Sequence, residues 1–273
     1  MARPLTYTWR ASDGEHELRF VPVPGTGGKP FLFGAGGQRR PIEVRDFHVQ
    51  TTPVTQALWV HVMGFNPVER EDPRRPVTNV SWEHIAGPNG FLEHIQASQI
   101  LERLGVDTAQ ARFLLPSETE WEYAARGGPH WTDGLRFSGS NDIREVAWSG
   151  PRFSPARRLV CRVLGWRVGW RLVGRRRLRH PTHPHDVATK APNQLGLYDL
   201  SGNVWEWCQD TCTNDLDAVP RDGSPHLGPE LERRLRGGCH DNWDLHCTVA
   251  FRYGITPDAH DGCIGFRLVL EQG

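Results

Sequence analysis

The chain has 273 residues, and 32 acidic residues are balanced by 32 Lys and Arg, so it carries no formal net charge at pH 7. This length is sufficient to bury a substantial hydrophobic core. The charge balance excludes a general electrostatic attraction to nucleic acid or to an anionic membrane. Nothing in the composition marks a boundary, so we expect a single domain over residues 1–273.

The N-terminus and the cysteine content bear on the cellular compartment. Residues 1–12 are mixed and polar, and nowhere do about eighteen apolar residues follow one another. Six cysteines are too few for a disulfide scaffold in a chain of this size. These features predict a soluble, cytoplasmic protein that does not enter a membrane and whose thiols are mostly free.

Short strands and helices are expected in the first part of the chain. Residues 18–23 and 44–49 have the pattern of strands and are separated by a Gly- and Pro-rich turn. Thr52 is the expected N-cap of a helix, because Pro53 suits the first helical position. Ser81 is the expected N-cap of a second helix, which a Gly-Pro-Asn-Gly turn interrupts before the helical pattern resumes.

The clearest local signal is a short helix that begins after Ser117. Ser117 and Glu120 form a capping box, Trp121 belongs to the buried stripe, and a pair of glycines ends the helix. The glutamates of its first turn also suit the helix dipole and need no catalytic explanation. Further along the chain, Trp205 and Trp207 would share one face of an extended segment.

The last stretch of the chain combines regular ends with an irregular interior. Its ends are an Arg-Gly-Gly turn at residues 236–238 and an Ile-Gly-Phe-Arg-Leu-Val run at residues 264–269, with Thr-Pro-Asp at residues 256–258 between them. The intervening residues follow no helical or strand period over any useful length. A segment with fixed ends and mixed chemistry inside indicates a presented binding surface.

Several ordered motifs resemble the formylglycine-generating enzyme family, also called the sulfatase-modifying factor family. They are Thr-Pro-Val-Thr-Gln at residues 52–56, Pro-Val-Thr-Asn-Val-Ser-Trp at 76–82, the helix at 116–128, Gly-Leu-Tyr-Asp at 196–199, Gly-Asn-Val-Trp-Glu-Trp at 202–207, and the two ends described above. The resemblance covers residues 18 to 270 except for an arginine-rich insertion. It implies an α+β, C-type-lectin-like fold with a small antiparallel sheet, two main helices and much irregular structure.

Two branches that share this fold would use the C-terminal segment differently. The resemblance implies that the enzymes use a cysteine pair with copper and oxygen to oxidise a substrate cysteine; here Asn242 matches the first cysteine and Cys247 the second. One thiolate cannot replace two in holding Cu(I). The chain resembles more closely the variable proteins of diversity-generating retroelements, in which Arg-Gly-Gly and Ile-Gly-Phe-Arg ends enclose diversified positions. Residues 239–263 lack Glu, Gln, Lys and Met, which diversification of Asn-type codons does not produce.

We therefore expect a non-enzymatic, monomeric protein that displays residues 239–263 on a fixed scaffold to bind another protein of unknown identity. A rigid scaffold reduces the entropy lost on binding, and Trp243, Phe251 and Tyr253 are the expected aromatic anchors. The expected ligand-binding residues are Cys239, His240, Asp241, Asn242, Trp243, Asp244, Leu245, His246, Phe251, Tyr253, Gly254, Ile255, Ala259, His260, Asp261, Gly262 and Cys263. The alternative function is a copper-dependent oxidase that converts cysteine to formylglycine.

A structural calcium ion is one metal that the resemblance allows. Asn203, Val204 and Glu206 would hold it through hard oxygen ligands. Hydrogen bonding that locks a turn explains these residues equally well, and the expected function requires no cofactor.

A thiolate metal site is the other alternative, and its candidate ligands are Cys239, Cys247, Cys263, His240 and His246. Their spacing contains no pair of cysteines separated by two residues, as structural zinc sites commonly have. We therefore expect these cysteines to be small apolar or surface residues without a metal.

The arginine-rich insertion occupies about residues 152–184. Between Arg152 and Arg179 it contains ten arginines and no acidic residue. Apolar and polar residues alternate from Trp166 to Leu172, which predicts an exposed ribbon with one apolar face against the acidic remainder. Nucleic-acid binding, with Trp stacking on bases and Arg contacting phosphates, is the alternative role of this insertion.

Overall fold

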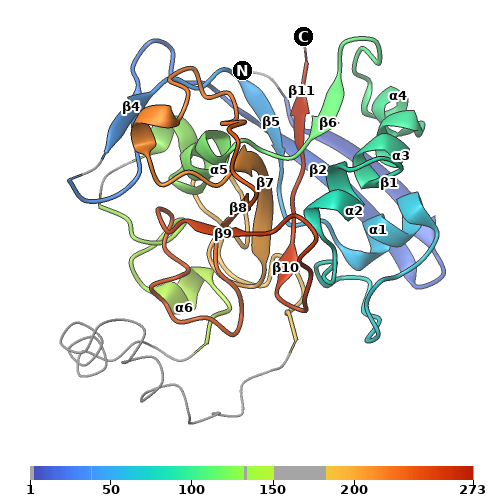
Figure 1. Ribbon diagram of the computed structural model, residues 1–273. Helices are drawn as coiled ribbons and strands as arrows, with labels where there is room; N and C mark the ends of the chain where they lie inside the picture. Colours follow the sequence, from blue (N-terminus) through green and yellow to red (C-terminus); the bar gives the residue numbers. More distant parts are fainter. Residues whose placement is uncertain (1–2, 38, 132–133, 151–182, 273) are drawn as a thin grey trace.

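The computed structural model describes residues 3–37, 39–131, 134–150 and 183–272 (Figure 1). Residues 152–182 lie outside the described residues. The predictions of a ribbon and of nucleic-acid contacts for the insertion therefore also concern residues outside this range. The described residues form an α+β fold with three sheets and short helices, as the resemblance implied. No helix among them is long and apolar enough to cross a membrane.

The largest sheet is antiparallel and has five strands. In spatial order these are β1 (Leu5–Ala11), β2 (Gly14–Val23), β5 (Phe47–Gln50), β11 (Val269–Glu271) and β6 (Arg112–Leu114). β1 was not predicted from the sequence, although its alternating burial places Leu5, Tyr7 and Trp9 in the core. The apolar residues of β1 are few and alternate with polar ones, so the sequence contained no clear signal. The strand pairs along its whole length with β2.

A second sheet carries the C-terminal segment. Its strands, in order, are β10 (Ile264–Gly265), β7 (Trp205–Thr211), β8 (Arg233–Arg236) and β9 (Tyr253–Ile255). Only the β10–β7 pair of this sheet is parallel. Trp205 and Trp207 are both buried on β7, as the pattern predicted for an extended segment. A small third sheet pairs β3 (Phe31–Phe33) with β4 (Arg40–Ile42).

The helices lie in two groups on either side of the molecule (Figure 1). They are α1 (Gln56–Met63), α2 (Trp82–Ala86), α3 (Phe91–Ala97), α4 (Ile100–Leu104), α5 (Glu118–Ala125), α6 (Ile143–Val146), and the 3-10 turns η1 (Gly128–His130) and η2 (Leu216–Ala218). α1 and α4 pack on β2 and β1, whereas α5 packs on β7 and β8. α1 and α5 are the longest described helices, with eight residues each.

Local signals placed two helix starts correctly and one incorrectly. Ser117 and Glu120 form the predicted capping box of α5, and Ser81 caps α2. The N-cap of α1 is Thr55 rather than Thr52. The reason is tertiary: Val54 remains extended, because its N–H donates to the carbonyl of Phe266 and its own carbonyl accepts from Val77, both at 2.8 Å.

The end of the chain separates two hydrophobic clusters. Phe266, Leu268 and Leu270 belong to the cluster under α1 to α4, whereas Val269 belongs to the cluster around α5. Successive residues of a strand point to opposite faces, so this stretch is buried on both sides. The C-terminal end of the irregular segment is therefore anchored in the core.

Candidate ligand-binding surface

Arg236 connects the Arg-Gly-Gly turn to the middle of the irregular segment. Its side chain is fully buried and donates hydrogen bonds to the carbonyl oxygens of Val249, at 2.9 Å, and Phe251. The guanidinium is also paired with the buried carboxylate of Glu122. Because the two segment contacts are made to backbone carbonyls, they do not depend on which side chains residues 249 and 251 carry.

Glu118, in the first turn of α5, joins three arginines from the second sheet and the segment. Arg252 binds both of its carboxylate oxygens, at 2.7 and 2.6 Å, and Arg234 and Arg236 pair with it at 3.2 and 3.6 Å. Burial alone would raise the pKa of Glu118, but the Arg252 hydrogen bonds and the three positive charges lower it below its usual value. Glu118 therefore does more than complement the helix dipole.

Arg267 and Glu206 fix the other end of the segment. Arg267 binds both oxygens of Glu206, at 2.6 and 2.7 Å, and donates to the carbonyls of Gln50 and Tyr198. The indole of Trp121 donates to the same carboxylate at 2.7 Å. This buried group links β7, α5 and the residues between β10 and β11.

The predicted calcium site does not fit these contacts. The Glu206 carboxylate is already neutralised by Arg267, whose charge would repel a calcium ion. The Asn203 side chain accepts from the N–H of His185 at 2.9 Å and donates to its carbonyl at 3.2 Å, and Val204 would offer only its backbone carbonyl. The contacts of Asn203 with the backbone of His185 instead agree with the alternative, a turn that hydrogen bonds hold in place.

Two glycines allow the chain to turn tightly after Arg236. Gly237 and Gly238 have φ values of 95° and 72°, in the left-handed region that favours glycine. A Cβ on Gly238 would lie 2.8 Å from Cys247 Sγ and 2.9 Å from the backbone of His246. The turn thus brings the segment back against its own start.

Several residues that we expected to contact a ligand are instead buried. Cys239, His240, Trp243 and Asp244 are inaccessible or nearly so, and the Trp243 ring lies parallel to that of His246. These side chains are buried where the chain turns back at Gly237 and Gly238, so they contribute to packing rather than to an outer surface. Trp243 in particular is not the exposed anchor that we predicted.

The remaining predicted residues are partly or fully accessible. Exposed side chains or glycines are Asp241, Tyr253, His260, Asp261 and Gly262, and half-buried ones are Asn242, Leu245, His246, Phe251, Gly254, Ile255, Ala259 and Cys263. Tyr253 is 46% exposed and lies 5.5 Å from Trp205 between ring centroids. Phe251 contacts both Trp205 and His246. These rings form a continuous aromatic row whose outer member is Tyr253.

A cavity lies beside the far end of the segment. It has a volume of about 510 Å³, and its lining includes Arg75, Asn79, His84, His260 and Gly262. The rings of His84 and His260 are 5.9 Å apart. The exposed end of the segment therefore borders a polar hollow that the sequence did not predict.

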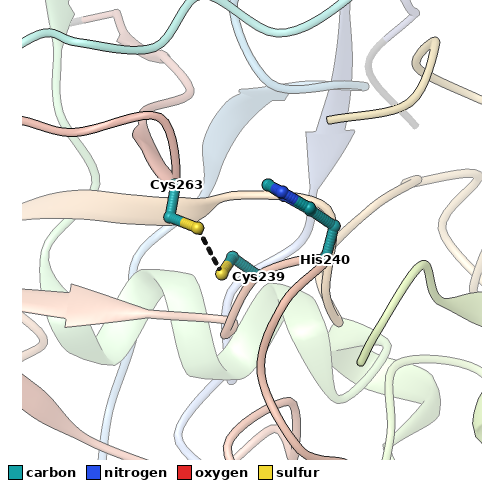
Figure 2. Close-up of side chains that lie close together, drawn as sticks. All are labelled: Cys239, His240 and Cys263. Carbon is teal, nitrogen blue, oxygen red and sulfur yellow. Dashed lines mark hydrogen bonds between the residues drawn. The ribbon is translucent and has the colours of Figure 1, made fainter. Parts of the chain in front are cut away.

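The segment also contains a cluster of potential metal ligands (Figure 2). A sulfur from Cys239, a sulfur from Cys263 and a ring nitrogen of His240 all lie within 4.8 Å of one another. Cys239 and Cys247 are buried in hydrophobic clusters, as expected of small apolar residues, but their spacing did not predict that the sulfur of Cys239 would face that of Cys263. The turn at Gly237 and Gly238 and strand β10 bring together cysteines that are far apart in the sequence.

The sulfur of Cys247 is not one of these three donors, although it lies 3.9 Å from the carbonyl oxygen of Cys239. Cys247 is fully buried, and burial strongly raises the pKa of its thiol above the ordinary value. Asn242, which matches the first cysteine of the enzymes' pair, is half-buried, and its side chain accepts from the N–H of Cys239. Asn242 and Cys247 therefore do not supply two thiolates for copper.

We call the buried pairs of Arg236, Arg252 and Arg267 with Glu118, Glu122 and Glu206 the frame. The sheets, the short helices and this frame define a C-type-lectin-like fold of the formylglycine-generating enzyme type. The chain belongs to this family, because the pattern of the Sulfatase-modifying factor enzyme 1-like domain matches residues 20–272. The formylglycine-generating enzyme of Streptomyces coelicolor is 34% identical over 217 residues, which are 77% of this chain and 59% of the enzyme. The chaperone protein LppX of Paenibacillus barcinonensis is 30% identical over 187 residues, which are 61% of this chain and 63% of that protein. The chain thus spans less than two thirds of the length of these relatives.

Solved structures share the fold over nearly the whole chain. The variable protein 1 of Treponema denticola superposes with a TM-score of 0.70 and 25% identity, covering 98% of this chain and 99% of that protein. PvdO of Pseudomonas aeruginosa superposes with a TM-score of 0.66 and 18% identity, covering 99% and 100%. The chain is therefore similar both to enzymes in sequence and to a variable protein in structure.

Proposed function

We propose that this chain is a ligand-binding variable protein of a diversity-generating retroelement. Its ligand would be another protein, bound at the accessible residues of the 239–263 segment. The observation that carries the proposal is the pair of hydrogen bonds from Arg236 to the backbone carbonyls of Val249 and Phe251. Support also comes from the similarity to the variable protein of Treponema denticola along the whole chain.

The frame suits a surface whose side chains change. Arg236 holds the segment through backbone carbonyls. Arg252, which belongs to the segment, holds it through Glu118, which lies outside the segment. Side chains that point outward can then be replaced without loss of the backbone shape. A preformed backbone also lowers the ordering entropy paid on binding.

The accessible side chains supply both anchoring and polar groups. Tyr253, supported by Trp205, offers a rigid aromatic ring with a hydroxyl, a group enriched in binding sites. Asp241, His260 and Asp261 add exposed polar groups to the segment. The polar cavity that His260 borders would receive a protruding side chain of the partner.

The alternative function, a copper-dependent formylglycine-generating oxidase, is supported by the 34% identity to the Streptomyces enzyme. Against it stand Asn242 in place of one cysteine and the burial of Cys247. Oxygen uptake by the Cu(I)-loaded protein with a cysteine-containing peptide decides between the functions. The binding proposal predicts no turnover, and formylglycine formation would contradict it.

The DNA beside the coding segment gives the most economical test of the retroelement assignment. We expect a near-duplicate of the 3′ coding segment that differs from it only at adenines, together with a reverse transcriptase gene. Absence of both from the complete genome would contradict the assignment.

A display library tests the binding surface itself. Residues Asp241, Leu245, Tyr253, His260 and Asp261 would be randomised and the library selected against lysozyme as the probe. We expect folded lysozyme binders. A matched library that randomises five exposed positions of β1 and β2 (Thr6, Thr8, Arg10, Glu15 and Glu17) should yield none, and equal yields from the two libraries would contradict the proposal.

A further inference from the structure

We propose that Cys239, His240 and Cys263 bind a Zn²⁺ ion, and that this ion ties together the two ends of the 239–263 segment. The proposal goes beyond ligand recognition, since it concerns the interior of the segment. Figure 2 shows the two sulfurs facing each other with the ring of His240 beside them. Among the residues that the structure describes, no other group of three such side chains lies as close together.

The donor types match the preference of zinc. Zn²⁺ binds thiolate sulfur at about 2.3 Å and imidazole nitrogen at about 2.0–2.1 Å, and it accepts two cysteines and one histidine with a fourth position open to water. The two Sγ atoms are 2.8 Å apart, closer than two thiols in van der Waals contact. A tetrahedral site would hold them about 3.8 Å apart, which small side-chain rotations provide.

The backbone holds both ends of the site before a metal ion arrives. The N–H of His240 donates to the carbonyl of Asn203 at 3.0 Å, and the carbonyl of Cys263 accepts from the N–H of Trp205 at 2.8 Å. Both ends are thus bonded to the same short stretch at the start of β7. A site preorganised in this way loses little entropy when the ion binds.

The histidine is oriented as metal-binding histidines commonly are. Its Nδ1 lies 3.0 Å from the carbonyl oxygen of Asn203, so it donates there in the Nδ1-protonated tautomer. That tautomer leaves the Nε2 lone pair for a metal ion, and the carbonyl contact fixes the ring. His240 is buried, so its ring is held in this orientation by packing as well as by the carbonyl contact.

The surrounding charge favours a cation. The carboxylates of Asp241 and Asp261 act electrostatically on both His240 and Cys263. Both aspartates are exposed, whereas Cys263 is half-buried, so the site has a route to solvent. Binding replaces the two thiol protons, which pass to the solvent, with one divalent ion.

Competition titration of the full chain tests the proposal. The protein is reduced, stripped of metal with a chelator and titrated with Zn²⁺ against a chromophoric zinc indicator. We expect one equivalent to bind, with an affinity that falls about 100-fold in Cys263→Ser and about 10-fold or more in His240→Gln. Cys212→Ser removes a thiol outside the site and should leave the affinity unchanged.

A spectroscopic readout shows whether the thiolates coordinate the ion directly. Co²⁺ in the stripped protein should give intense visible bands of a tetrahedral site and thiolate charge-transfer bands, which Cys263→Ser weakens. Circular dichroism checks that each variant is folded. Absence of stoichiometric binding to the reduced protein, or an equal loss in Cys212→Ser and Cys263→Ser, would overturn the proposal. These readouts need no protein ligand, so they succeed or fail independently of the proposed function.

Discussion

The two halves of the 239–263 segment are held in different ways. In residues 239–250, six side chains are buried: Cys239, His240, Trp243, Asp244, Cys247 and Val249. In residues 251–263 no residue is buried, although every position is described. The first half is therefore constrained by packing, and the second half, apart from Arg252 and Cys263, carries the accessible side chains that would vary under the proposed function. A segment that looks uniformly irregular in sequence thus divides into a support and a surface.

The largest effect is expected when the frame is broken. Arg236→Ala would leave the buried carboxylates of Glu118 and Glu122 short of a positive charge and remove the contacts to two backbone carbonyls. We expect a loss of about 5 kcal/mol in the free energy of unfolding, measured by urea denaturation. Arg10→Ala, on the exposed face of β1, is the control and should change stability by less than about 0.5 kcal/mol. Similar stabilities of the two variants would contradict the role of Arg236.

Two aromatic truncations compare the halves directly. Trp243→Ala removes a ring that is only 9% exposed and should cost about 3 to 5 kcal/mol of unfolding free energy. Tyr253→Ala removes a ring that is 46% exposed and should cost about 1 kcal/mol or less. Thermal and urea denaturation measure both variants. A greater loss in Tyr253→Ala would reverse the assignment of support and surface.

The pH dependence of stability distinguishes a buried carboxyl, Asp199, from an exposed one, Asp258. Burial raises the pKa of Asp199 to about 6, against an ordinary value of 3.8. A raised folded-state pKa means that the folded protein favours the protonated form, so this stabilisation is present below pH 4 and is lost as the pH rises to about 6. The loss from this group is about 3 kcal/mol.

Asp199→Asn removes that titration. The stability of the variant relative to the original protein should therefore increase between pH 4 and pH 6, as measured by urea denaturation across this range. Asp258→Asn, in the exposed half, serves as the control and should not produce such an increase. A parallel pH profile for Asp199→Asn and the original protein would contradict the burial argument.

The smallest predicted difference concerns two glycines, Gly238 directly before the segment and Gly262 within it. Gly238→Ala forces a side chain into the left-handed region and within 2.8 Å of Cys247 Sγ, so we expect a loss of about 1 to 3 kcal/mol. Gly262→Ala adds a Cβ where nothing lies within 4 Å and should be neutral to within about 0.5 kcal/mol. Differential scanning calorimetry of both variants makes the comparison, and equal melting temperatures would count against it.

Local patterns predicted the local structure, and long-range contacts account for the errors. Ser117 and Glu120 cap α5 through contacts three residues apart, which a sequence shows directly. The start of α1 moved from Thr52 to Thr55 because Val54 pairs with Phe266, more than two hundred residues away. The lectin-like fold was confirmed, and it came from the order of several motifs rather than from any single pattern.

For the candidate binding segment, too, local motifs were visible in the sequence whereas long-range contacts were not. The ends of the segment were visible as motifs, but the burial of Trp243 and the approach of Cys239 to Cys263 depend on the turn at Gly238. Spacing rules for metal ligands address neighbouring cysteines, so they overlooked a pair separated by 24 residues. The role of Glu118 was also hidden, because its main partner, Arg252, lies 134 residues away in the sequence.

The crystal structure of a triple variant tests the central claim most directly. Tyr253→Ser, His260→Tyr and Asp261→Asn together replace three exposed side chains of the second half. The account predicts that the Cα atoms of residues 249–263 stay within about 1 Å of their positions and that Arg236 still binds the carbonyls of residues 249 and 251. A rearranged or untraceable segment would show that the exposed side chains, rather than the frame, determine the backbone.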